Sequence, residues 1–356
     1  MEDEYIMNTI YTGGKRISGG LKKVILLASL IVFALTITAC GKKEDGTSSA
    51  AAAETGTEKK QHKEIVATIF PEYDWVREIL GENPGEFELT LLLDSGVDLH
   101  SFQPTAEDIM RISRCDMFIY VGGESDKWVA DALKEATNKD MVVINLMEEM
   151  GNAAVEEEAV EGMQGEEEEE EEGEEEGPEY DEHVWLSLRS AVHFTDVIEK
   201  KLETIDPEHK SVYEANAKAY MDKLSKMDED FTKVVDSAAR KTVLFGDRFP
   251  FRYFTENYGL KYYAAFLGCS AETEASFETV TFLAGKVDEL SLPVIFVIEG
   301  GEKRLADTIL KNTKDKTAEI VSLDSMQGTT KKDIDAGATY ISIMEKNLAA
   351  MEKGLK

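Results

Sequence analysis

Short apolar segments alternate with helical segments from residue 63 to the end of the chain, and this alternation limits the possible folds more than any other feature. The predicted strands are 63–70, 87–95, 115–122 and 141–147 in the first half, then 241–247, 260–268, 293–300 and 319–325 in the second half. Their apolar, β-branched cores are typical of parallel sheets covered by helices. We therefore expect an α/β protein with parallel sheets.

A long apolar stripe lies between the two halves. It starts at Tyr213 and continues at spacings of four and three residues through Ala217, Tyr220, Leu224, Met227, Phe231, Val234 and Ala238. This spacing predicts one apolar face of a helix that begins near Pro207. A helix of about thirty residues would be roughly 45 Å long. We interpret it as a rigid strut between two α/β lobes, although a core helix of one larger domain would give the same stripe.

These patterns predict the domain organisation. We assign residues 64–184 to an N-terminal α/β lobe, residues 185–240 to linking helices and residues 241–356 to a C-terminal α/β lobe. The N-terminal lobe contains a glutamate-rich stretch, residues 155–180, which we expect to be a disordered loop. About 270 residues remain without this loop and the N-terminal region, enough for two modest lobes.

The first forty residues have the features of a bacterial lipoprotein signal peptide. Basic residues precede a short apolar run, VILLASLIVFAL, and the run ends in Ile37-Thr38-Ala39-Cys40, which resembles a lipobox. The resemblance implies that Cys40 is lipidated, for example with palmitate, and anchors the chain to the outer face of the cell membrane. Residues 41–63 are polar and would form a flexible tether. An uncleaved transmembrane anchor is the alternative.

Charge and cysteine content exclude several classes of protein. The formal net charge is −32, and about half of it comes from the glutamate-rich stretch. The remainder is moderately acidic, which argues against nucleic acid as a partner and against binding to an anionic membrane surface. Cys115 and Cys269 are far apart in sequence. They can be two buried thiols or a single disulfide, but one pair does not define a disulfide-rich scaffold.

Four positions near strand ends carry side chains that bind divalent transition metals. His100 follows the second predicted strand, and His183 lies where the glutamate-rich stretch meets a helical segment. Asp247 and Asp324 follow apolar strand cores in the second half. Ligands of open parallel sheets bind beyond the carboxyl ends of the strands. Two imidazoles and two carboxylates fit a four- or five-coordinate metal ion.

Several motifs resemble the metal-binding receptors of bacterial ABC importers that carry zinc and manganese. GVDLHSFQPTAED (96–108) is similar to the first ligand motif of that family, and DEHVWLSL (181–188) is similar to the second. FVIEGG and LDSMQGTT resemble its closing strand and the loop with an aspartate ligand. The resemblance runs from about residue 65 to the C-terminus and implies that His100, His183 and Asp324 bind the metal.

The third ligand position departs from the family pattern. Zinc receptors have a histidine there and manganese receptors a glutamate, whereas this chain reads FGDRFPFRYF. Different alignments place Gly246, Asp247 or Arg248 at the position, and a guanidinium cannot bind a cation. We choose Asp247, whose alternative roles are a salt bridge with Arg248 or a helix N-cap. Other possible ligands are the carboxylates of Glu272 and Glu274.

The resemblance implies a receptor that binds Zn²⁺ in the cleft between the lobes and delivers it to the membrane permease and ATPase subunits of an ABC importer. We expect a monomer without catalytic activity, since no HExxH pairing or comparable acid–base pair is present. The alternatives are a manganese receptor, a surface adhesin or metal scavenger of the same fold and, less favoured, a zinc hydrolase. The glutamate-rich loop either gathers divalent ions near His183 or is only a solvated insertion.

Overall fold

The computed structural model describes residues 62–165, 179–270, 274–301 and 303–356 of the chain. Residues 59–356 form one compact unit. None of the helices in these described ranges is long and apolar enough to cross a membrane. The predicted signal peptide with Cys40 and the candidate ligand Glu272 lie outside the described residues, as do most of the tether and residues 166–178 of the glutamate-rich stretch.

Two four-stranded parallel sheets form the framework, and both have the same strand order. The first sheet has the order β2-β1-β3-β4 and consists of β1 (Glu64–Ala67), β2 (Glu88–Leu91), β3 (Met117–Tyr120) and β4 (Val142–Asn145). The second has the order β6-β5-β7-β8 and consists of β5 (Thr242–Phe249), β6 (Lys261–Leu267), β7 (Val294–Ile298) and β8 (Glu319–Leu323). The α/β class and the parallel sheets predicted from the sequence are therefore confirmed.

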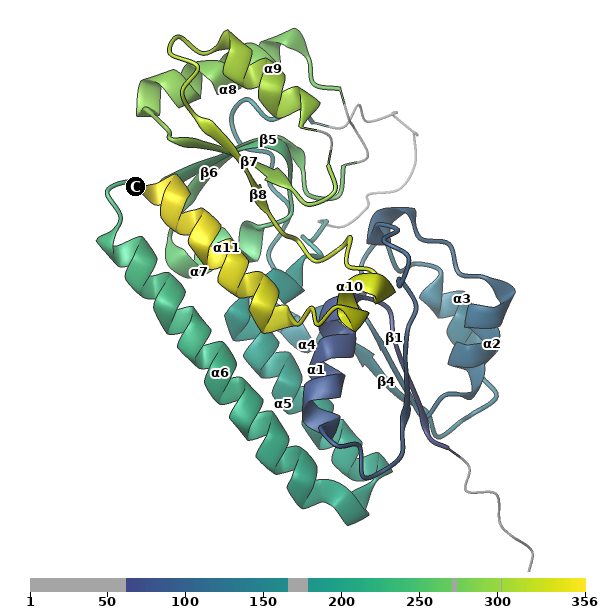
Figure 1. Ribbon diagram of the computed structural model, residues 1–356. Helices are drawn as coiled ribbons and strands as arrows, with labels where there is room; N and C mark the ends of the chain where they lie inside the picture. The colour runs from purple at the N-terminus through teal and green to yellow at the C-terminus, as the bar shows by residue number, and fades with distance from the viewer. Residues whose placement is uncertain (1–61, 166–178, 271–273, 302) are drawn as a thin grey trace, which may run out of the picture. The chain divides into compact units, whose positions relative to one another are not determined.

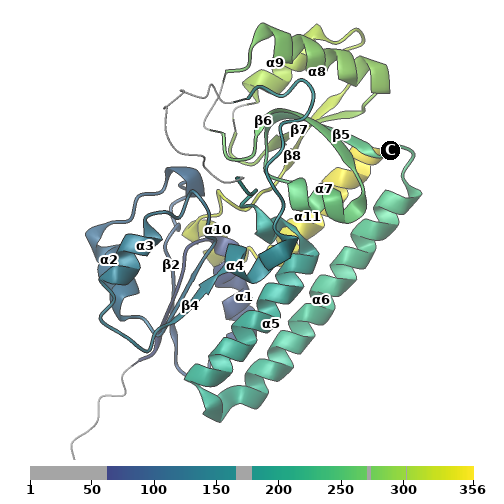
Figure 2. The same cartoon turned by 180° about the vertical axis from the view of Figure 1, so that it is seen from behind.

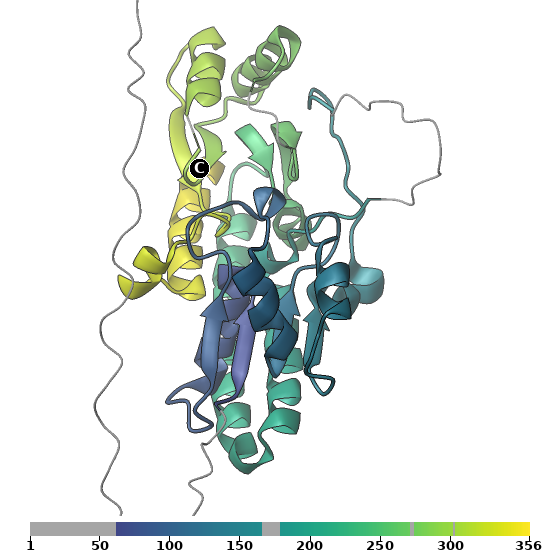
Figure 3. The ribbon, with the colours of Figure 1, turned by 90° about the vertical axis from the view of Figure 1, so that its right-hand side faces the viewer.

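Helices cover both faces of each sheet, as the apolar strands require (Figures 1 and 2). Around the first sheet they are α1 (Phe70–Leu80), α2 (Ala106–Arg114), α3 (Val129–Lys134), the short α4 (Leu146–Met150) and α5 (Leu188–Ile205). Around the second sheet they are α7 (Arg252–Tyr258), α8 (Phe277–Leu290), α9 (Arg304–Asn312) and α11 (Tyr340–Leu355). The short α10 (Lys331–Asp335) precedes α11, and Figure 3 shows α11 (yellow) running from α10 along the second sheet.

The long helix predicted between the halves is α6 (Lys210–Ser237), which has 28 residues and lies beside α5 and α11 (Figure 1). The buried residues of its stripe are Tyr213, Ala217, Tyr220, Leu224, Met227, Phe231 and Val235. The sequence pattern had placed Val234 and Ala238 at the end of this stripe, but both are only partly buried. A straight helix has 3.6 residues per turn, so a strict seven-residue repeat drifts off the buried face.

A single hydrophobic core joins the two sheets through these helices. It includes Ile65 of β1, Phe231 of α6, Phe296 of β7 and Met344 of α11. A smaller core fills the space between the second sheet and the pair α8 and α9. Because the larger core is shared, the two sheets cannot separate widely without exposing it. The exact lobe boundaries stay predictions.

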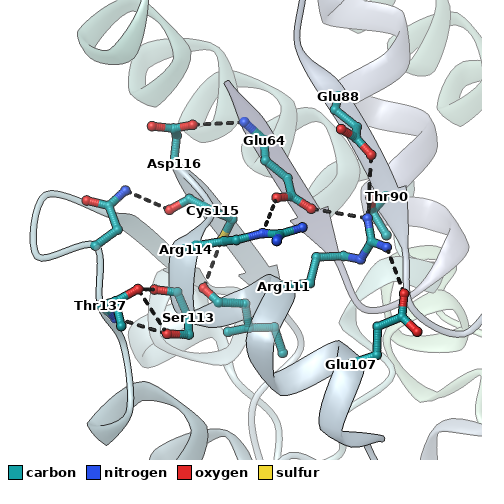
Figure 4. Close-up of polar contacts among 12 residues, drawn as sticks. Glu64, Glu88, Thr90, Glu107, Arg111, Ser113, Arg114, Cys115, Asp116 and Thr137 are labelled. Carbon is teal, nitrogen blue, oxygen red and sulfur yellow. Dashed lines mark hydrogen bonds and ion pairs between the residues drawn. The ribbon is translucent and has the colours of Figure 1, made fainter. Parts of the chain in front are cut away.

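Ion pairs with the buried carboxylate of Glu64 attach α2 to the first sheet (Figure 4). The carboxylate of Glu64 on β1 accepts from Arg111 Nη1 and from Arg114 Nε, both at 3.2 Å. Arg111 also pairs with Glu88 on β2 and with Glu107, both at 3.5 Å. Glu64 is buried, so its two contacts are less screened by solvent than those that Arg111 makes with the exposed Glu88 and Glu107. They hold the helix that directly follows the loop carrying His100.

Glu72, in the first turn of α1, should make stability depend on pH. The side chain is fully buried, and its Oε2 accepts from the backbone N–H groups of Thr68 and Ile69. Burial, aided by the charge of Asp126, raises the pKa of Glu72 from 4.5 to about 8. The native state therefore holds this proton while the unfolded chain loses it, and stability falls as pH rises between these two values.

We expect Glu72→Gln to remove the pH dependence of stability that comes from Glu72, since glutamine cannot ionise. The free energy of unfolding of the variant, relative to that of the native chain, should increase by up to about 1.4 kcal/mol for each pH unit between about pH 5 and pH 8. Urea unfolding at several pH values measures the difference, with exposed Glu107→Gln as the control. A difference that does not change with pH would contradict this assignment.

Candidate metal centre

His183 is held in one orientation by a buried aspartate. It precedes the 3₁₀ turn η3 (Val184–Leu186), and its side chain is completely buried. Asp181 Oδ1 accepts from the backbone N–H of His183 at 2.8 Å and from its ring Nδ1 at 3.0 Å. Because an ionised carboxylate only accepts, the proton is on Nδ1 and the lone pair is on Nε2. This arrangement of carboxylate and histidine is typical of metal ligands.

His100 approaches from the loop after β2. It lies in the 3₁₀ turn η1 (Leu99–Ser101), where the side chain of Asp98 accepts from the backbone N–H of His100 at 3.0 Å. Ser125, in the loop after β3, is 2.6 Å from His100 Nδ1. The remaining ring nitrogen, Nε2, is 3.2 Å from Nε2 of His183. Nitrogen ligands of a tetrahedral zinc ion lie about 3.3 Å apart, given Zn–N distances of about 2.0–2.1 Å.

The environment of His100 keeps its imidazole neutral. Burial, with the neighbouring His183 and Arg248 adding to it, lowers the pKa of His100 to about 3, although Asp98 opposes the shift. A neutral imidazole is the form that binds a metal ion. The ring is therefore ready to act as a ligand at neutral and mildly acidic pH.

A third potential ligand, Cys269, lies beside the two histidines. One atom each from His100, His183 and Cys269 can be chosen so that all lie within 4.8 Å of one another. Within the described residues this is the only group of three or more such side chains. Cys269 follows the carboxyl end of β6, so the rule that sites form at strand ends applies to it as well. From the sequence, Cys269 was predicted only to be a buried or paired thiol.

The two cysteines left open by the sequence are both free thiols. Cys115 is buried next to α2, where its Sγ is 3.2 Å from the carbonyl oxygen of Ile112. Cys269 is half-buried, and burial raises the pKa of its thiol. The structure therefore contains no disulfide between them.

Asp247 does not lie in this group. Its Oδ1 accepts from the backbone N–H of Arg248 at 2.9 Å, and its Oδ2 accepts from that of Ile298 at 3.1 Å. The carboxylate thus joins β5 to the end of β7. The strand pairing shifts register between Phe245 and Arg248, within the stretch where different alignments to the family motif are possible. The alternative role of Asp247, a salt bridge with Arg248, is not found among the described contacts. Arg248 pairs with Asp98 instead.

Asp324 lies at the carboxyl end of β8 and lines a cleft of about 640 Å³ together with Asp98, Arg248 and Glu299. Its Oδ1 accepts from the backbone N–H of Met326 at 2.8 Å. Burial raises the pKa of Asp324 and, with the charge of Asp324 nearby, raises that of Glu299 to about 7. Asp324 is not part of the histidine and cysteine group. Its role as a ligand stays a prediction, as does that of Glu274, which is exposed.

Buried carboxylates surround the histidines. Glu182 Oε1 accepts from the backbone N–H of Ser125 at 3.0 Å, and its Oε2 is 4.0 Å from His100 Nδ1. Among the described residues, this Oε2 and Glu157 Oε1 are buried oxygens without a hydrogen-bond partner. Burial raises the pKa of Glu182 and brings that of Glu157 to about 7. In their ionised forms, these two carboxyl groups and that of Asp181 give a negative potential that favours a bound cation.

Asp181 is expected to contribute to metal affinity without touching the metal. Asp181→Ala should lower zinc affinity about 10- to 100-fold, because His183 loses the acceptor that fixes its ring and tautomer. Isothermal titration of metal-stripped protein measures the change. Asp131→Ala, at an exposed aspartate of α3, is the control. Equal affinities for the two variants would show that Asp181 does not orient the ligand.

Residues 65–354 match the family described as zinc-uptake complex component A periplasmic, ZnuA. A high-affinity zinc uptake system protein ZnuA of Bacillus subtilis is 30% identical over 322 residues, covering 90% of this chain and 94% of that protein. A zinc-binding lipoprotein AdcA of Streptococcus pneumoniae is 29% identical over 338 residues, covering 94% of this chain but only 61% of that protein. For AdcA of Streptococcus pyogenes the chain spans 55% of the length.

The fold of the chain is also similar to those of solved zinc-binding and metal-dependent lipoproteins. The Zn(II)-bound ZnuA-like domain of Streptococcus pneumoniae AdcA superposes with a TM-score of 0.64 and 26% identity, covering 83% of this chain and 99% of that domain. The metal-dependent lipoprotein YcdH of Bacillus subtilis gives a TM-score of 0.66 and 26% identity, covering 83% of this chain and 100% of that one.

Proposed function

Because the chain belongs to the ZnuA family of zinc-uptake components, we propose that it is an extracytoplasmic receptor that binds Zn²⁺ and delivers it to a membrane importer. The chain covers little more than half the length of the AdcA proteins, so their activity as whole proteins is not carried over. The ZnuA-like domain of AdcA, which was solved with Zn(II) bound, supports zinc as the ion.

One observation carries the proposal: the two Nε2 atoms of His100 and His183 face each other at 3.2 Å. Each Nδ1 has its own partner, Ser125 for His100 and Asp181 for His183. At this distance the two nitrogens share either a proton or a metal ion, and the spacing is that of two zinc ligands. A pair of histidines that only filled space would not need both outer nitrogens to be fixed.

The remaining parts of the function follow from the family and the sequence. Asp324, which the resemblance assigns as a ligand, would approach the ion from the second sheet, and Asp247 would hold β5 against β7. Cys40 would carry the lipid anchor, as the name lipoprotein of the relatives suggests. The partners would be the permease and ATPase subunits of an ABC importer. The family comprises uptake components, and we extend this to the absence of catalysis in this chain.

Uptake of radioactive zinc by cells that lack the protein tests this function. We expect low uptake at scarce zinc, restored by the unaltered chain but not by His183→Ala. Cys40→Ser should restore uptake only weakly if the lipid anchor keeps the receptor at the membrane. Normal zinc uptake without the protein, in cells that have no second zinc importer, would contradict the proposal.

A further inference from the structure

We propose that Cys269 is the third metal ligand of this receptor and binds the ion as a thiolate beside His100 and His183. This inference rests on the proposed function for the identity of the metal. It assigns to Cys269 the role that a histidine or glutamate has in the family motif, and it places this ligand after β6 rather than in β5.

The position of Cys269 and the backbone geometry of the turn before it support this assignment. Cys269 is the second residue after β6, and its ligand atom lies within 4.8 Å of those of both histidines. The preceding residue, Gly268, packs directly on the ring of His183. A Cβ at this position would be 2.9 Å from His183 Cε1 and 2.9 Å from the carbonyl oxygen of Phe249. Only glycine lets the turn approach the imidazole this closely.

Neither Asp247 nor Arg248, the two side chains at the usual third position, lies in the ligand group: both oxygens of Asp247 accept from backbone N–H groups, and Arg248 is paired elsewhere. Its guanidinium forms an ion pair with Asp98, the residue that caps the turn carrying His100. A guanidinium has no lone pair for a metal ion. The two neutral imidazoles themselves contribute no negative charge toward a divalent ion in a buried site. A thiolate supplies both a third donor atom and a negative charge.

Cys115 shows what a purely structural thiol looks like in the same chain. Its Sγ is 3.2 Å from the carbonyl oxygen of Ile112 and 3.4 Å from the sulfur of Met141, and it belongs to no group of potential ligands among the described residues. Cys269 instead lies among histidines and carboxylates, including Glu157 and Glu182. The two thiols thus differ in whether other potential metal ligands lie beside them.

The chemistry of the ligand set explains a preference between metals. Thiolate and imidazole favour zinc, whereas manganese prefers oxygen ligands. On binding, the Cys269 thiol gives its proton to solvent as the S–Zn bond forms, so zinc uptake should release a proton. The receptor would therefore reject manganese through Cys269, even though it lacks the third histidine of zinc receptors.

Cobalt binding tests the assignment on the unaltered sequence. The chain from residue 41 onward contains the whole unit 59–356 and only two cysteines, Cys115 and Cys269. We expect its Co²⁺ form to show a thiolate-to-metal charge-transfer band in the near ultraviolet. The band should persist in Cys115→Ser and disappear in Cys269→Ser. The zinc affinity of Cys269→Ser should fall about 100-fold or more. This loss exceeds the usual effect of removing a residue that only hydrogen-bonds to a metal ligand.

The outcomes separate the two proposals. One bound Co²⁺ without the band, together with unchanged zinc affinity in Cys269→Ser, would overturn the cysteine assignment and leave the receptor function intact. No binding of zinc or cobalt by the unaltered chain would overturn both. Because the band is read first on the unaltered chain, a failure of Cys269→Ser to fold would not prevent the test.

Discussion

Replacing His183 by alanine is expected to weaken zinc binding by at least about 100-fold. Loss of a partner that merely orients a ligand costs about 10- to 100-fold in metal affinity, and His183 is itself a proposed ligand. Its ring is completely buried between His100 and Trp185, with ring centroids 5.2 Å away on both sides. No other imidazole of the described residues can take its place. Competition with a chelator of known affinity measures the loss.

His193→Ala is the matched control for this variant. His193 is exposed on α5, and its Nε2 contacts only the carbonyl oxygen of Glu149 at 3.1 Å among the described hydrogen bonds. Zinc affinity should stay unchanged in this variant. Tight zinc binding by His183→Ala would mean that the ion binds elsewhere, and equal losses in both variants would indicate a general effect on folding.

Replacing Phe231 by alanine is expected to destabilise the protein by about 3–5 kcal/mol, the usual cost of removing a fully buried aromatic ring. Phe231 lies on α6 and packs against two rings of α7, with centroid distances of 5.0 Å to Phe254 and 5.6 Å to Tyr258. The cavity would open in the core shared by both sheets. Denaturant unfolding of the metal-free protein measures the change.

Val234→Ala provides the comparison for the long helix. The sequence pattern assigned Val234 to the buried stripe, but the structure leaves it only partly buried. We expect a cost of about 1 kcal/mol or less. A cost for Val234→Ala as large as that for Phe231→Ala would show that α6 is rotated relative to the structure described here.

The sequence was sufficient to predict the framework. Apolar, β-branched strand cores separated by helical segments allow few arrangements other than covered parallel sheets, and all eight predicted strands are present. The end of the α6 stripe was predicted less well, because the seven-residue spacing that leads to Val234 and Ala238 departs slowly from the true turn of a helix. Only packing against neighbouring helices decides that Val235 is buried instead.

The candidate site was only partly predictable. His100 and His183 were identified because each lies in a motif at the edge of a regular element, and the structure brings them together. An aspartate at a strand end, however, can equally well hold backbone N–H groups, as Asp247 does. Local sequence does not distinguish these two uses of a carboxylate.

Cys269 was missed for a different reason. Its position beside the histidines depends on two sheets facing each other and on Gly268 allowing a close approach to His183. Neither condition is visible in a stretch such as LGCS read alone. Applying the strand-end rule to sulfur donors, and not only to histidine and aspartate, would have made it a candidate.

A competitive titration of zinc against manganese tests whether this chain is a zinc receptor. The chain from residue 41 onward is stripped of metal with chelator, and Zn²⁺ and Mn²⁺ are added together while bound metal is measured. We expect one zinc ion per chain, not displaced by an equal concentration of manganese and lost in His183→Ala. Manganese binding as tight as that of zinc, or no tight site for either ion, would show that the chain is not a selective zinc receptor.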